Sequence, residues 1–182
     1  MRIIGGEFKG RKFHPPAKKW PTRPTTDFAK EGLFNILMNH FDFGNLKVLD
    51  LFGGTGSHSY EFISRGCCDV TYVDQFGPAV NFVRKTVEEL GVEKCIRIRR
   101  SDVFKFIDNA HETYDYIFAG PPYRLSGLDR IPDLIFERDL LAPGAWLVLE
   151  HNPHHDFKHH PSLWQERKYG KTRFSIFVRA DG

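Results

Sequence analysis

Short apolar runs alternate with longer amphipathic stretches between Leu46 and Glu150, and this alternation limits the possible folds more than any other feature. Buried strands are expected at 47–52, 70–73, 95–99, 114–119 and 145–150. Helices are expected between them, at 57–65, 78–90, 103–109 and 128–138. Strands joined by helices form a parallel sheet that is covered on both faces. The sequence therefore predicts an α/β fold around a mostly parallel sheet.

Segments outside this alternation extend the predicted fold at both ends. Two further strands are expected on either side of Gly170-Lys171-Thr172, at 165–169 and 173–178. They are typical of a hairpin, which adds an antiparallel edge to the sheet and brings it to seven strands. Residues 1–13 alternate and contain glycines, which predicts a small N-terminal β-hairpin. We expect an α/β domain at 25–182, preceded by a basic hairpin and a proline-rich linker at 1–24.

The positive charge is concentrated at the N-terminal end of the chain. The 182 residues carry a net charge of only +3, but residues 1–30 hold eight basic and two acidic side chains. A basic arm on a mildly acidic body suits a polyanionic partner such as RNA or DNA. The alternative is a solvated terminus that has no partner.

Length and composition exclude several classes of protein. The length fits one domain, and a hydrophobic content of 41% excludes wholesale disorder. No apolar run approaches the roughly 20 residues of a membrane span, and the start lacks the apolar stretch of a secretory signal. Three cysteines without a C-x-x-C pair form neither a disulfide framework nor a zinc site. We expect a cytoplasmic protein without a membrane partner, and a monomer is favoured.

A glycine-rich loop follows the first strand of the alternation. Gly53, Gly54 and Gly56 lie between the strand at 47–52 and the next helix, where an open α/β sheet binds its ligand. Glycines allow a sharp turn and a close approach of the backbone to that ligand. The alternative interpretation is a turn with a purely geometric role.

Two features after this loop indicate the kind of ligand. Asp74 ends the second strand, 24 residues beyond Asp50, where an acidic side chain can accept hydrogen bonds from two ribose hydroxyls. Ser59 takes the position of the third glycine in the G-x-G-x-x-G pattern, which disfavours a dinucleotide. A nucleoside cofactor is therefore favoured over NAD, and the alternative for Asp74 is a solvated strand end.

A rigid loop, Gly120-Pro121-Pro122-Tyr123, follows the fourth strand. The prolines end the strand and fix the backbone, and the tyrosine offers a face on which a nucleobase can stack, worth about 1–3 kcal/mol. Combined with a glycine loop after strand one, this loop indicates methyl transfer to the amine of a base. Taken alone, it is equally consistent with a loop stiffener.

Four stretches together resemble one family of enzymes. They are MRIIGGEFKGRKF (1–13), RPTTDFAKEGLFNIL (23–37), LDLFGGTGSHSYEFISRG (49–66) and YDYIFAGPPY (114–123), and the ending YGKTRFSIF (169–177) also fits. The chain resembles the RsmD family, the 16S ribosomal RNA guanine-N2 methyltransferases that use S-adenosylmethionine. The resemblance covers essentially the whole chain and implies the class I methyltransferase form of the Rossmann-like fold.

The resemblance also implies roles for individual residues. The cofactor would be bound by Arg23, Thr25, Thr26, Asp27, Asp50, Phe52, Gly53, Gly54, Thr55, Gly56, Asp74, Asp102 and Val103. The catalytic loop would consist of Gly120, Pro121, Pro122 and Tyr123. Phosphates of small-subunit ribosomal RNA, naked or in an assembling 30S particle, would be bound by Lys9, Arg11, Lys12, Lys18 and Lys19. The chemistry needs no metal.

One position departs from the family pattern. The family has Asp or Asn where this chain has Gly120, and that side chain accepts a hydrogen bond from the target amine. Gly120 offers only its carbonyl, and losing a charged acceptor costs about 1.5–3 kcal/mol, or roughly ten- to a hundredfold in rate. The departure is consistent with a slow enzyme, with a substitute carboxylate or with an altered copy of the gene.

Other reactive side chains have simpler interpretations. The five histidines within 151–160 suggest a surface loop with incidental affinity for nickel or zinc. We expect His58 to lie on a helix face rather than to act as a base. We also expect Cys67 and Cys68 to be buried apolar residues, and Glu150 to be a solvated strand end rather than a proton acceptor.

Three other functions are the alternatives to the RNA methyltransferase. An adenine-N6 DNA methyltransferase uses a similar Asn-Pro-Pro-Tyr loop, but this sequence shows no obvious target-recognition domain. A non-catalytic RNA-binding relative is favoured by Gly120. An NAD oxidoreductase is disfavoured by Ser59 and by the Pro-Pro-Tyr loop.

Overall fold

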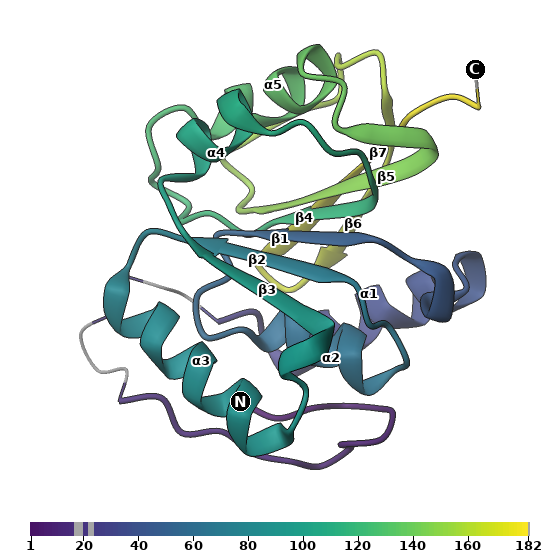
Figure 1. Cartoon of the computed structure of the whole chain (residues 1–182). Helices are drawn as coiled ribbons and strands as arrows, with labels where there is room; N and C mark the ends of the chain where they lie inside the picture. Colours follow the sequence, from purple (N-terminus) through teal and green to yellow (C-terminus); the bar gives the residue numbers. More distant parts are fainter. Residues whose placement is uncertain (17–19, 22–23, 182) are drawn as a thin grey trace.

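The structure is a computed structural model that describes residues 1–16, 20–21 and 24–181. A seven-stranded sheet lies at its centre (Figure 1). The strands are β1 (Val48–Leu51), β2 (Val70–Asp74), β3 (Ile96–Arg100), β4 (Tyr114–Ala119), β5 (Leu141–His151), β6 (Leu163–Tyr169) and β7 (Thr172–Val178). Their order across the sheet is β3-β2-β1-β4-β5-β7-β6. Strands β1 to β5 are parallel, and β7 is antiparallel to both β5 and β6. The predicted α/β fold with an antiparallel C-terminal edge is confirmed.

Five α-helices cover the sheet within these described residues. They are α1 (Asp27–His40), α2 (Ser57–Ser64), α3 (Gly77–Leu90), α4 (Val103–Asn109) and α5 (Ile131–Glu137), with short 3-10 turns η1 (Phe43–Asn45), η2 (Glu93–Cys95) and η3 (Leu128–Arg130). Helices α1, α2 and α3 lie on one face, and α4 and α5 lie on the other (Figure 1). Successive residues of β5 face opposite cores, because Trp146 packs with the α1–α3 side and Leu147 with the α4–α5 side.

Local signals mark the ends of the helices. Thr26 caps α1, and its hydroxyl accepts a hydrogen bond from the Ala29 N–H at 3.2 Å. Gly91, with a φ of 69°, ends α3. Strand β5 begins earlier than predicted, since Leu141 already pairs with Tyr114 ahead of a shift in register. That pairing is a contact between distant segments and leaves no local pattern in the sequence.

Residues 1–13 form a loop that a single antiparallel bridge closes, between Arg2 and Lys12. The predicted N-terminal hairpin is thus reduced to one bridge rather than two regular strands. Ile3 and Phe13 anchor the loop because both side chains are buried in the core on the α1–α3 side. The predicted domain boundary between residues 24 and 25 stays a prediction.

The cysteines differ in part from expectation. Cys68 and Cys95 form a disulfide, so the expectation that Cys68 is a buried apolar residue is wrong. The pairing follows from the topology: Val70 of β2 lies beside Ile96 of β3, which brings the segments just before these strands together. Cys67 is buried as expected, and burial raises the pKa of its thiol to about 11, which leaves it unreactive.

Among the helices of the described residues, we find none with the length and apolar character needed to span a lipid bilayer.

Candidate active site

The carboxyl ends of β1, β2 and β4 open into a cavity of about 540 Å³. Eleven of the residues that the sequence nominates line it: Thr25, Asp50, Phe52, Gly53, Gly54, Thr55, Asp74, Asp102, Val103, Gly120 and Pro122. The glycine loop and the Pro-Pro loop meet here because β1 pairs directly with β4, with Leu51 opposite Ala119. The structure therefore brings the predicted cofactor loop and the predicted catalytic loop into one cavity.

The glycine loop is held in a conformation that few residues can adopt. Phe52 has a φ of 57°, which is unusual for a residue with a side chain. A Cβ on Gly53 would lie 2.3 Å from the Tyr72 ring, so only glycine fits. The Tyr72 hydroxyl in turn donates a hydrogen bond to the Gly54 carbonyl at 2.5 Å. The packing of β2 thus fixes a bare stretch of backbone at the cavity wall.

Asp74 ties the glycine loop to the end of β2. Its carboxylate accepts hydrogen bonds from the Gly54 N–H and from the Phe76 N–H, both at 2.8 Å. The side chain is 7% exposed, so Asp74 is not the solvated strand end given as the alternative. It still lines the cavity, at the position where a ribose would be expected.

Asp50 is a buried carboxyl at the floor of the cavity. It accepts a hydrogen bond from the Ser59 hydroxyl at 2.6 Å. Burial raises the pKa of Asp50 to about 7; the nearby Asp74 carboxylate adds to this rise, and the hydrogen bond from Ser59 opposes it. Ser59 therefore replaces a glycine with a hydroxyl that holds this carboxyl group in place.

Asp102 and Val103 border the cavity where α4 begins. Asp102 caps this helix, and its carboxylate accepts a hydrogen bond from the Lys105 N–H at 3.0 Å. Val103 is buried beside it. The cap explains locally why an acidic residue follows β3, independently of any ligand.

The nominated N-terminal residues are divided among different places. Thr25 lines the cavity, whereas Thr26 caps α1 and Asp27 forms an exposed ion pair with Arg2 at 2.8 Å. Arg23 lies outside the described residues. Gly56 does not line the cavity; with a φ of 86° it occupies the N-cap of α2.

The predicted catalytic loop presents its residues unequally. Gly120 and Pro122 line the cavity, whereas Pro121 is buried and does not line it. Tyr123 is half-buried outside the lining, and its hydroxyl donates a hydrogen bond to Glu150 Oε2 at 2.7 Å. Glu150 is only 4% exposed, so the expectation of a solvated strand end is wrong.

His58 lies in α2, and its side chain belongs to the buried wall of the site. Its ring stacks on Phe118 with centroids 3.7 Å apart, and Nε2 lies 3.2 Å from the Tyr116 hydroxyl. Burial, assisted by the nearby Lys30 charge, holds the pKa of His58 well below its usual value. The imidazole is therefore neutral at physiological pH. Phe118 was missed by the sequence reasoning, although its alternation with Ile117 in the strand already placed it on this face.

The histidine-rich stretch is structured by contacts with the protein. His151 is buried, with Nε2 2.7 Å from the Ser175 hydroxyl. His155 lies 2.7 Å from Asp129 and 3.0 Å from the Tyr123 carbonyl, so it supports the loop at residues 120–123. Within the described residues, no group of His, Cys, Asp and Glu side chains is arranged to hold a metal ion.

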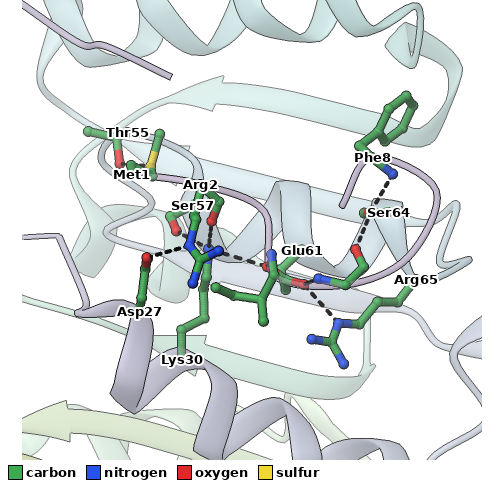
Figure 2. Close-up of polar contacts among 12 residues, drawn as sticks. Met1, Arg2, Phe8, Asp27, Lys30, Thr55, Ser57, Glu61, Ser64 and Arg65 are labelled. Carbon is green, nitrogen blue, oxygen red and sulfur yellow. Dashed lines mark hydrogen bonds and ion pairs between the residues drawn. The ribbon is translucent and has the colours of Figure 1, made fainter. Parts of the chain in front are cut away.

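A buried ion pair joins α1 to α2, the helix that follows the glycine loop, and its lysine also contacts the N-terminal segment, residues 1–13 (Figure 2). Lys30 Nζ lies 3.3 Å from Glu61, and it donates hydrogen bonds to the Arg2 carbonyl at 2.7 Å and to the Ser57 hydroxyl at 3.0 Å. Ser57 lines the cavity. Burial lowers the pKa of Lys30, and the neighbouring Glu61 carboxylate opposes this shift.

Glu61 also holds the backbone of the N-terminal segment. Its two carboxylate oxygens accept hydrogen bonds from the N–H groups of Ile4 and Gly5, both at 2.9 Å, and Arg65 completes the cluster at 2.8 Å (Figure 2). The segment is thus fixed against α2 by a carboxylate that is fully buried. No local pattern in the sequence indicates this contact.

The nominated RNA-binding residues are only partly within the described chain. Lys9, Arg11 and Lys12 are exposed on the N-terminal segment. Lys18 and Lys19 lie outside the described residues.

Comparisons with known proteins give consistent results. The family model Cons_hypoth95, described as conserved hypothetical protein 95, matches residues 1–178. The rRNA methyltransferase YlbH of Bacillus subtilis is 36% identical over 155 residues, which cover 84% of this chain and 83% of that protein. Ribosomal RNA small subunit methyltransferase D of Escherichia coli K12 is 26% identical over 182 residues, which cover 98% of this chain and 90% of that protein. The solved structure of the E. coli methyltransferase yhhF has a TM-score of 0.85 at 26% identity, covering 100% of this chain and 99% of that chain.

Proposed function

The chain belongs to the RsmD family of ribosomal RNA methyltransferases, and we propose that it transfers a methyl group from S-adenosylmethionine to the N2 amine of a guanine in small-subunit ribosomal RNA. One observation carries this proposal. The glycine loop after β1 and the Pro-Pro loop after β4 line the same cavity. A cofactor on the first loop and a base on the second would therefore meet.

The cavity fits a nucleoside cofactor with a charged amino-acid end. Gly53 and Gly54 present backbone without side chains. Hydrogen bonds from the Tyr72 hydroxyl to the Gly54 carbonyl and from the Gly54 N–H to Asp74 fix this backbone. The buried carboxyls of Asp50 and Asp74 suit an ammonium group and ribose hydroxyls respectively. When bound, S-adenosylmethionine supplies an electrophilic methyl group on a sulfonium.

The catalytic loop would orient the target base. The guanine must leave its stack to reach the cavity, and its ring would then lie against Tyr123. The rigid carbonyls of Gly120 and Pro121 would accept hydrogen bonds from the amine. These contacts help the nitrogen become tetrahedral as its bond to the methyl forms and the sulfur–methyl bond breaks. The nitrogen then releases one proton to solvent, and the protein contributes mainly positioning.

The N-terminal segment would bind the RNA backbone. Lys9, Arg11 and Lys12 are exposed there, and Lys18 and Lys19 are assigned the same role from the sequence alone. Contacts with phosphate add affinity without reading the sequence, and they weaken as salt rises. The substrate is small-subunit RNA, either naked or within an assembling particle.

Labelled methyl transfer tests the proposed function. We expect transfer from S-adenosylmethionine to small-subunit RNA or 30S particles, and none to DNA. Tyr123→Ala should keep the affinity for S-adenosylmethionine and lose most of the turnover, because it removes the stacking face. Unchanged turnover would refute the stacking role. Cofactor binding without any transfer would instead support the non-catalytic RNA-binding relative that Gly120 favours.

A further inference from the structure

Glu150 is a nearly buried carboxyl group at the carboxyl end of β5, beside the site. It accepts a hydrogen bond from the Tyr123 hydroxyl at 2.7 Å and another from the Thr25 hydroxyl. These donors lie 27 and 125 residues away in the sequence. One side chain thus connects the sheet, the catalytic loop and the segment that precedes α1.

The register of the sheet places Glu150 next to the unusual position of the catalytic loop. Ala119 of β4 lies opposite Leu149 of β5, so the residues that follow them, Gly120 and Glu150, lie side by side at the two strand ends. Gly120 carries no side chain with which to organise the loop. The neighbouring strand therefore supplies a carboxyl group where the loop itself has none.

Tyr123 is held at both of its ends. Glu150 binds the phenol hydroxyl, and His155 lies 3.0 Å from the backbone carbonyl of the same residue. A tyrosine ring bonded at its hydroxyl and at its backbone has little freedom to rotate about its side-chain torsions. Its aromatic face is consequently fixed before a base arrives, which lowers the entropic cost of aligning that base.

We propose that Glu150 is a positioning residue, which fixes the Tyr123 ring for the target base and fixes Thr25 against the cofactor. The proposal rests on the proposed function, because it assigns Tyr123 and Thr25 to substrate and cofactor. Glu150 acts through these two residues and not on the reacting atoms. Its two contacts lead to two separable effects, one on turnover and one on cofactor affinity.

The test compares single and double variants of the full-length chain. For each variant we would measure kcat and KM for small-subunit RNA by labelled methyl transfer, and the affinity for S-adenosylmethionine by calorimetry without RNA. Glu150→Ala removes both contacts, and Glu150→Gln keeps the size and one acceptor oxygen. Tyr123→Phe and Thr25→Val each remove one donor. Glu166→Ala is the matched control, because Glu166 pairs with Arg173 at 3.4 Å on the C-terminal hairpin.

The two contacts of Glu150 should affect different quantities: the contact with Tyr123 should affect kcat, and the contact with Thr25 should affect the affinity for S-adenosylmethionine. Glu150→Ala should lower kcat by about tenfold or more and weaken the affinity for S-adenosylmethionine several-fold, the scale expected for removing a hydrogen bond to a charged group. Tyr123→Phe should lower only kcat, and Thr25→Val should weaken only cofactor binding. Glu150→Gln should fall between Glu150→Ala and the unmodified protein. The control should match the unmodified protein in both measurements.

A double variant decides whether Glu150 works through Tyr123. Combining Glu150→Ala with Tyr123→Phe should lower kcat no further than Glu150→Ala alone, because both changes remove the same hydrogen bond. Multiplicative losses would overturn the proposal, and so would a normal kcat in both Glu150 variants. If Glu150→Ala does not fold, Glu150→Gln carries the same comparison.

Failure of the proposed function gives a different result. In that case the unmodified protein itself transfers no methyl group to RNA. The calorimetry then still tests the hydrogen bond between Glu150 and Thr25, because it needs no RNA. Equal affinity for S-adenosylmethionine in Glu150→Ala and the unmodified protein would overturn the role of that hydrogen bond.

Discussion

Gly120 has little room for a side chain, so replacing it should lower the stability of the fold. A Cβ at this position would lie 2.9 Å from the Phe118 ring, and that ring stacks on His58 at 3.7 Å. An added side chain must therefore shift a packed aromatic pair. Overpacking of this kind destabilises a protein by about 1–3 kcal/mol.

This geometry makes Gly120→Asp testable against a matched control. Gly120→Ala meets Phe118 in the same way but adds no acceptor, so both variants should lose about the same stability in thermal unfolding. Of the two new side chains, only that of aspartate can accept a hydrogen bond from the proposed target amine. We therefore expect Gly120→Asp to methylate RNA faster than Gly120→Ala. Equal rates would show that the acceptor is supplied elsewhere.

The raised pKa of Asp50 gives stability a pH dependence. The pKa is 3.8 for the ordinary group and about 7 in the folded protein. Between these values the folded chain keeps a proton that the unfolded chain has released, so raising the pH through this window removes stability. The loss reaches at most about 1.4 kcal/mol per pH unit.

Asp50→Asn removes this titration and should make the free energy of unfolding depend less on pH. The free energy of unfolding of the variant should rise relative to the unmodified protein as the pH increases toward 7, and the difference should level off above it. Chemical denaturation of both proteins at several pH values measures this difference. The other titrating groups are the same in the two proteins, so their contributions cancel. A difference that does not vary with pH would contradict the assignment to Asp50.

Among the secondary-structure elements, the main prediction concerns the contact between the N-terminal segment, residues 1–13, and α2. Glu61→Ala leaves the buried Lys30 without its partner and removes the acceptor for the N–H groups of Ile4 and Gly5. Breaking a buried pair costs about 3–5 kcal/mol. The variant should be destabilised on that scale, with faster hydrogen exchange in residues 1–13.

An exposed ion pair provides the control. Glu112→Ala breaks a surface pair with Lys47 at 2.8 Å, and such pairs contribute about 0–1 kcal/mol. It should leave hydrogen exchange in the N-terminal segment unchanged. If Glu61→Ala also leaves that exchange unchanged, Glu61 does not fix the segment.

The elements themselves were predictable because their signals are local. The apolar run at 47–52 that became β1 and the helix at 78–90 that became α3 can be read from neighbouring residues. The contact of Glu150 with Tyr123 and Thr25 cannot, because it depends on the order and register of the strands. The same reason explains the missed Cys68–Cys95 disulfide and the interpretation of Glu150 as a solvated strand end.

For the whole molecule, the distribution of charge determines how RNA binding responds to salt. Replacing Lys9, Arg11 and Lys12 with alanine should weaken RNA binding and reduce the slope of log affinity against log salt by about 0.7 for each phosphate that the protein no longer neutralises. The affinity for S-adenosylmethionine should not change, because these residues do not line the cavity.

A second set of exposed basic residues tests whether the location matters. Replacing Lys105, Arg130 and Lys158, which are exposed elsewhere, removes the same charge and should leave the salt slope nearly unchanged. Equal slopes for the two triple variants would mean that RNA responds to the net charge and not to the N-terminal segment.

The identity of the modified nucleoside tests the central claim most directly. Small-subunit RNA would be incubated with the protein and S-adenosylmethionine, digested to nucleosides and analysed by mass spectrometry. We predict a single new product, N2-methylguanosine. Methylation of adenine, or of DNA in place of RNA, would contradict the proposal that a guanine amine reaches the cofactor in this cavity.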